Sequence, residues 1–73
     1  MLKYSVISRE GEVARYYYYP EGRLEAPGVL EIVGNTKSGK VIEESKADFN
    51  KRYAFQGIRG IDVSKDKGTV AWY

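Results

Sequence analysis

Three acidic side chains lie close together in this sequence, and paired carboxylates can act as general acid and base. Glu43 and Glu44 are adjacent, and Asp48 follows shortly after them. Two carboxylates share these roles when their surroundings separate their pKa values. Residues 41–44 are predicted to form a strand, however, and adjacent strand side chains point to opposite faces. Glu43 and Glu44 are therefore not expected to form a catalytic pair, and Asp48 is expected to start a helix.

Nucleophilic and metal chemistry are limited by composition. The chain contains no His and no Cys. Its serines therefore have no imidazole to activate them, and thiolate or imidazole metal sites and disulfides are excluded. We predict that the protein is not an enzyme and that it holds no metal ion and no cofactor. No site for a small-molecule substrate is evident.

Two glycine-containing stretches match nucleotide or nucleic-acid motifs only in part. Residues 34–40 fit the first seven positions of a phosphate-binding P-loop, but Val41 stands where Ser or Thr should hold magnesium. A strand is also predicted to follow, where a P-loop needs a helix N-terminus. Residues 57–60 have the GXXG form of the KH-domain loop, again with a strand predicted after it instead of a helix. We interpret the first stretch as a polar hairpin loop and the second as a helix end with a bend.

The most unusual feature is a run of four tyrosines closed by a proline. In a strand, Tyr16 and Tyr18 would share one face, and Tyr17 and Tyr19 the other. One pair is expected in the core, and the other would give the surface more aromatic area than a small protein usually exposes. Tyrosine is enriched at protein interfaces. We therefore predict an interface, for a protein partner or a second copy, formed by Tyr16, Tyr17, Tyr18, Tyr19 and Pro20.

Basic residues in the second half of the chain offer an alternative function. Residues 37–73 carry eight basic and five acidic side chains, whereas residues 1–36 carry four and five, so the overall net charge is +2. Cations interleaved with aromatic rings can bind single-stranded nucleic acid. The alternative hypothesis is therefore a nucleic-acid contact made by Lys46, Lys51, Arg52 and Arg59. The charge excess is smaller than that of a typical nucleic-acid-binding patch.

The elements that would position these residues follow from the pattern of apolar side chains. Alternation predicts strands over residues 2–8, 13–19, 28–33 and 41–44, and again over 59–64 and 69–73. Ser45 and Asp48 match a capping box, and Gly57 suits a helix end, so a helix is predicted over 46–56. Short links favour antiparallel neighbours. The predicted fold is α+β with the order β-β-β-β-α-β-β, and the alternative is a small curled β-barrel with one helical turn.

The length of 73 residues predicts a single domain spanning residues 1–73. A chain this short buries only about 60% of the surface that its unfolded form exposes, so a second copy could add stability. No stretch is apolar enough for a signal-peptide core or a membrane span. We therefore expect a soluble, cytoplasmic, bacterial-type interaction module without a membrane partner.

Overall fold

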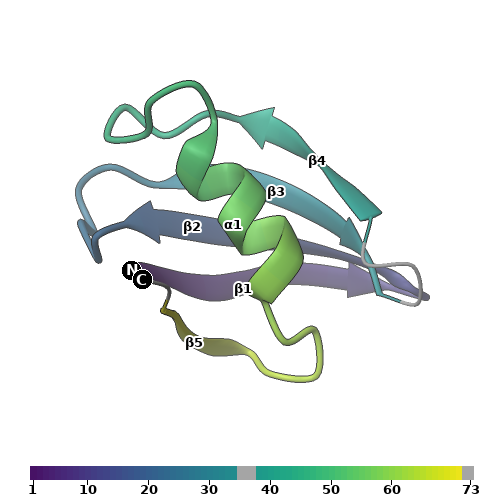
Figure 1. The fold of residues 1–73 in the computed structure, drawn as a ribbon. Coiled ribbons are helices and arrows are strands. Elements are labelled where there is room, and N and C mark those ends of the chain that lie inside the picture. The colour runs from purple at the N-terminus through teal and green to yellow at the C-terminus, as the bar shows by residue number, and fades with distance from the viewer. Residues whose placement is uncertain (35–37, 72–73) are drawn as a thin grey trace.

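Five strands form one antiparallel sheet, and one helix crosses one of its faces (Figure 1). The computed structural model describes residues 1–34 and 38–71. Its elements are β1 (Leu2–Glu10), β2 (Val13–Pro20), β3 (Gly28–Val33), β4 (Ser38–Glu43), α1 (Arg52–Gly60) and β5 (Lys67–Val70). The strand order is β4-β3-β2-β1-β5, with β4 and β5 at the two edges. The predicted α+β class is confirmed, and the sheet is not closed into the alternative barrel.

A bulge in β1 decides which of its side chains face the helix. Val6 pairs with Tyr16 and Ser8 with Arg15, so Ile7 is an extra residue with no partner of its own on β2. An extra residue of this kind reverses the alternation beyond it. Arg9, which pairs with Ala14, therefore lies on the helix side of the sheet.

The core lies between α1 and the face of the sheet beneath it. Tyr16 and Tyr18 are completely buried there, whereas Tyr17 is 40% exposed on the opposite face. This settles the alternation within the tyrosine run, with the even-numbered pair inward. The buried apolar residues are Leu2, Tyr4, Ala14, Tyr16, Tyr18, Leu30, Ile32, Ala54 and Ile61.

Glycines make room for two of the buried tyrosine rings. Tyr18 pairs with Gly28 across β2 and β3, and Tyr4 pairs with Gly68 across β1 and β5. A Cβ on Gly68 would lie 2.6 Å from the Tyr4 hydroxyl oxygen, and a Cβ on Gly28 would overlap the Tyr18 ring. Each ring thus occupies the space that a cross-strand side chain would otherwise fill.

The helix differs from its prediction at both ends. It begins at Arg52 and ends at Gly60, so Gly57 lies buried inside it and is not its cap. Ser45 does not begin the helix, because its Oγ accepts the Ala47 N–H and donates to the Ala26 carbonyl. These bonds hold a turn.

The strand predicted over residues 59–64 is wrong, because the helix continues through Gly60 and the chain then turns at Asp62. The last predicted strand is present as β5, although residues 72 and 73 of that prediction lie outside the described part. The predicted hairpin loop over 34–40 includes residues 35–37, which also lie outside it. Its remaining residues from Ser38 onward belong to β4, so no helix follows as a P-loop would require.

Replacing Gly28 with alanine should destabilise the fold by about 2–3 kcal/mol, because the new methyl group overpacks a buried site. It would meet the Tyr18 ring and lie 2.8 Å from the Ser45 backbone nitrogen. The change would be measured as the free energy of unfolding in urea. Gly34→Ala is the matched control, since its nearest contact is an ordinary 3.4 Å to Val63. Equal effects of the two substitutions would contradict this packing.

Candidate functional site

The face of the sheet opposite α1 is covered by no helix in the described part of the chain (Figure 1). We call it the open face. Strand pairing assigns its side chains, because directly opposed residues share a face. They are Lys3, Ser5, Ser8 and Glu10 of β1; Val13, Arg15, Tyr17 and Tyr19 of β2; Val29, Glu31 and Val33 of β3; Ser38, Lys40 and Glu43 of β4; and Lys67 and Thr69 of β5.

Two of the five predicted interface residues reach this face. The rings of Tyr17 and Tyr19 lie side by side on β2 with their centroids 6.3 Å apart. The Tyr19 hydroxyl is 3.2 Å from Ser5 Oγ, in a hydrogen bond whose donor either group can supply. Tyr16, Tyr18 and Pro20 are buried, so their prediction as interface residues is corrected.

Charged residues in the middle of the open face neutralise one another. Arg15 Nε donates to Glu31 Oε2 at 3.0 Å, and Lys40 Nζ lies 3.7 Å from Glu31 Oε1. The three side chains come from the neighbouring strands β2, β3 and β4. The Glu31 side chain is only 17% exposed, so the two cations shield it.

A pocket of about 510 Å³ opens at one corner of this face, between β1, β5 and the β2–β3 loop. Lys3 and Lys67 stand at its wall, and neither forms an ion pair within the described residues. Leu24, 69% exposed, and the Tyr19 ring supply apolar surface. The pocket therefore combines two free cations with apolar walls. Its lining is Lys3, Tyr4, Ser5, Tyr19, Leu24, Lys67, Gly68 and Thr69.

The predicted nucleic-acid residues lie elsewhere. Lys46, Lys51, Arg52 and Arg59 are all exposed, on α1 or the segment before it. Phe55, 55% exposed, lies between Arg52 and Arg59 along the outer side of the helix. These cations are thus on the helix side of the sheet, whereas Tyr17 and Tyr19 are on the open face. The basic residues and the outward half of the tyrosine run do not form one surface.

Two aromatic residues near the helix lie outside the core. Phe49 is 70% exposed. Tyr53 is half-buried, and its hydroxyl donates to Glu21 Oε2 at 2.9 Å. This hydrogen bond raises the pKa of Tyr53. Tyr53 therefore ties the helix to the β2–β3 loop.

Two of the three clustered acidic residues, Glu44 and Asp48, accept hydrogen bonds from backbone N–H groups near the helix. Asp48 accepts the Tyr18 hydroxyl at 2.8 Å and the backbone N–H groups of Tyr53 and Ala54 at 2.9 and 3.1 Å. The Ser45 N–H in turn donates to the Tyr18 oxygen at 2.9 Å. Glu44 accepts the Lys51 N–H. These carboxylates hold the start of α1, and they are occupied by backbone donors.

Burial of its ring raises the pKa of Tyr18 well above the ordinary value of 10.0, and the hydrogen bond to Asp48 raises it further. Sequence reasoning missed this network because its members are distant along the chain. The only local signal was Asp48 at the start of a helical pattern.

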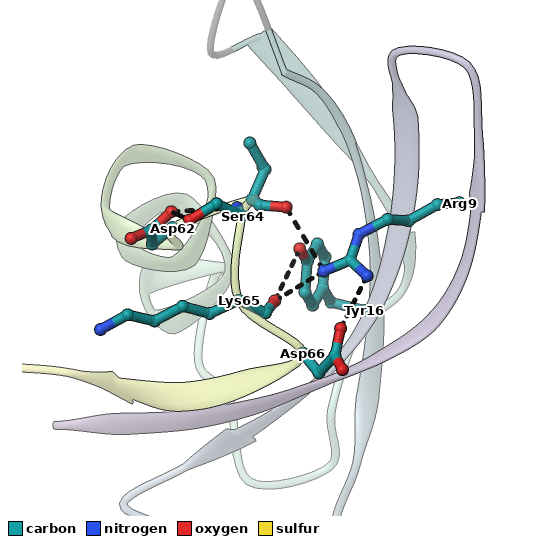
Figure 2. Close-up of polar contacts among 7 residues, drawn as sticks. Arg9, Tyr16, Asp62, Ser64, Lys65 and Asp66 are labelled. Carbon is teal, nitrogen blue, oxygen red and sulfur yellow. Dashed lines mark hydrogen bonds and ion pairs between the residues drawn. The ribbon is translucent and has the colours of Figure 1, made fainter.

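A second polar network fixes the chain between α1 and β5 (Figure 2). Arg9 reaches from β1 and donates to Asp66 Oδ1 at 2.6 Å and to the Lys65 carbonyl at 2.9 Å. The Tyr16 hydroxyl donates to the same carbonyl at 3.3 Å, and Ser64 donates to Asp62. The hydrogen bond to Asp66 raises the pKa of Arg9. Arg9 can lie here because the bulge places it on the helix side.

No group of acidic residues in the described part of the chain is arranged to hold a metal ion. No helix of that part is long and apolar enough to cross a membrane. Comparisons with protein-family models, with curated proteins and with solved structures gave no match. The candidate site is therefore the open face itself, with its ring pair and corner pocket.

Replacing Tyr18 with phenylalanine should lower the free energy of unfolding by about 1–2 kcal/mol, because the buried Ser45 N–H loses its acceptor and Asp48 loses a donor. Urea denaturation would measure the loss. Tyr17→Phe is the matched control, since the Tyr17 hydroxyl has no hydrogen-bond partner among the described residues. A Tyr18→Phe variant as stable as this control would show that the network is dispensable.

The same tyrosine should make stability fall in alkali. The pKa of Tyr18 is higher in the folded state than the ordinary 10.0, so its neutral hydroxyl stabilises the folded state fully below pH 10. This stabilisation is lost as the pH rises above 10. The free energy of unfolding, measured between about pH 8 and 11, should therefore fall more steeply with pH for the wild type than for Tyr18→Phe. An equal pH dependence would mean that the Tyr18 hydroxyl has the same pKa in the folded and unfolded states.

Proposed function

We propose that this protein is a non-catalytic protein-interaction module and that its open face is the binding surface. The observation that carries this proposal is the Tyr17 and Tyr19 ring pair, which stands uncovered on the central strand. Half-buried Val13, Val29 and Val33 extend the apolar area around the rings. Tyrosine rings bury a large area while keeping a hydrogen-bonding tip, which suits them to protein contacts.

The charges of the open face favour a protein over a nucleic acid. The described residues of this face include four cations and three carboxylates. Arg15 and Lys40 are already neutralised by Glu31, so only Lys3 and Lys67 are left to attract an anion. A phosphate backbone needs several free cations and would meet Glu10 and Glu43. A protein surface can match both signs.

The size of the face is close to that of a protein complex. The five strands are 4 to 9 residues long, so at about 3.3 Å per residue and about 4.8 Å between strands they present about 500 Å². Specific protein complexes bury about 600–1,000 Å² on each partner. The open face alone falls just below that range, and the neighbouring β2–β3 loop adds to it.

A photo-reactive benzoylphenylalanine at position 17 should cross-link to protein in cells that make this chain, because the Tyr17 ring would lie inside the complex. The adducts would be detected by gel shift and mass spectrometry. The same residue at position 55, on the outer side of α1, is the matched control and should give few adducts.

Two results would count against the proposal. One is the absence of protein adducts from position 17 when the variant is folded. The other is adducts that nuclease treatment removes, which would favour the nucleic-acid alternative. Adducts from position 55 alone would move the binding surface to the helix side.

A further inference from the structure

The pattern of side chains on the open face is complementary to itself. We propose that the protein partner is a second copy of this chain, packed open face to open face around a two-fold axis perpendicular to the strands. In this arrangement Glu10, at the base of each copy's β1–β2 hairpin, faces the corner pocket of the other copy. This inference rests on the proposed function and names the partner of the same face.

The strand pairing arranges the open face as four rows that run across the sheet. Each row contains residues that stand directly opposite one another on neighbouring strands. From the corner pocket toward the β1–β2 hairpin, the rows are Thr69–Lys3–Tyr19, then Lys67–Ser5–Tyr17–Val29–Glu43, then Ser8–Arg15–Glu31–Lys40, then Glu10–Val13–Val33–Ser38.

A two-fold axis perpendicular to the strands, midway between the second and third rows, places opposite charges together. This axis places each strand over the same strand of the second copy and reverses the order of the rows. Lys3 of one copy then faces Glu10 of the other on β1. On β4, Glu43 faces Lys40. By symmetry each of these pairs occurs twice.

The same axis places both outward tyrosine rings of one copy against side chains of β2 in the other. On β2, Tyr17 faces Arg15 of the second copy, where a guanidinium can stack on the ring. Tyr19 faces Val13. Packed sheets lie about 10 Å apart and cross at about −30°, a gap that tyrosine, lysine and arginine side chains can span.

The corner pocket and the start of the β1–β2 hairpin are complementary in charge. Glu10 ends β1 in the fourth row, and the hairpin turn at Gly11 lies just beyond it. The pocket spans the first two rows and carries Lys3 and Lys67, neither of which forms an ion pair within the described residues. Row reversal therefore places Glu10 of one copy over the Lys3 side of the other copy's pocket.

A two-fold axis parallel to the strands is less favourable. Passing through the central strand β2, it would keep each row on itself, so it would pair Lys67 with Glu43 but would put Arg15 directly against Arg15 of the second copy. Facing like charges cost binding energy. Only the perpendicular axis pairs opposite charges on both β1 and β4.

Sedimentation equilibrium from about 10 μM to about 1 mM protein would measure self-association across weak to moderate affinities. The wild type should form dimers. Lys3→Glu should weaken the dimer about tenfold or more, because two attractive pairs become repulsive. Glu10→Lys should do the same. Lys46→Glu on the helix side, which changes the net charge equally, is the matched control and should leave the dimer unchanged.

Charge reversal at both positions tests the pairing itself. The double variant Lys3→Glu/Glu10→Lys should recover most of the wild-type affinity, since each reversed residue again faces an opposite charge. An equimolar mixture of the two single variants should form mixed dimers more strongly than either variant associates alone. Circular dichroism would establish that each variant is folded.

Three outcomes would overturn the inference: a wild type that stays monomeric up to about 1 mM, single variants that dimerise like the wild type, or a double variant no better than the single ones. A monomeric wild type whose position-17 cross-links contain another protein would leave the proposed function standing. The absence of any protein cross-link from position 17 would instead remove the proposed function as well.

Discussion

The hydrogen bond between the Tyr18 hydroxyl and Asp48 joins the two layers of this small protein. Tyr18 belongs to the central strand of the sheet, and Asp48 also accepts backbone N–H groups at the start of α1. The bond therefore fixes where the helix begins and where it lies on the sheet. Once α1 covers the even-numbered tyrosines, the odd-numbered pair must face outward. The chemistry of the open face thus depends on a contact made on the opposite side.

The tyrosine run illustrates which part of the fold the sequence can specify. Sliding the run by one residue would replace tyrosine with tyrosine on both faces, so the hydrophobic pattern alone does not set its register. Contacts with β3 set the register of the run instead. Gly28 provides space for one ring only, that of Tyr18, and Arg15 forms its ion pair with Glu31 on the next strand. These contacts join distant parts of the chain and so leave no local signal.

The four N-terminal strands and the fold class could be predicted, because apolar alternation and turn residues are local. The helix could be predicted but not placed. Ser45 and Asp48 satisfy a capping box in sequence, yet Ser45 bonds to Ala26 while Asp48 serves a helix that begins at Arg52. Because the helix begins and ends later than predicted, its last residues occupy positions 59 and 60, where the wrongly predicted strand was to begin. Of the candidate site, the tyrosine pair could be found by composition, whereas Lys3 and Lys67 meet only through the pairing of β1 with β5.

The bulge at Ile7 determines which side chains at the end of β1 face the helix and which face outward. With it, Arg9 reaches inward to the α1–β5 segment and Glu10 stands on the open face. Regular pairing through Ile7, without the bulge, would exchange the two, leaving the inner segment with a carboxylate and the outer face with an extra cation. Deleting Ile7 would instead keep both orientations, because Ser8, Arg9 and Glu10 would then follow Val6 in regular alternation. The bulge therefore accommodates one additional residue in β1 while preserving both the anchoring of the C-terminal strand and the sign of the charge that the hairpin presents.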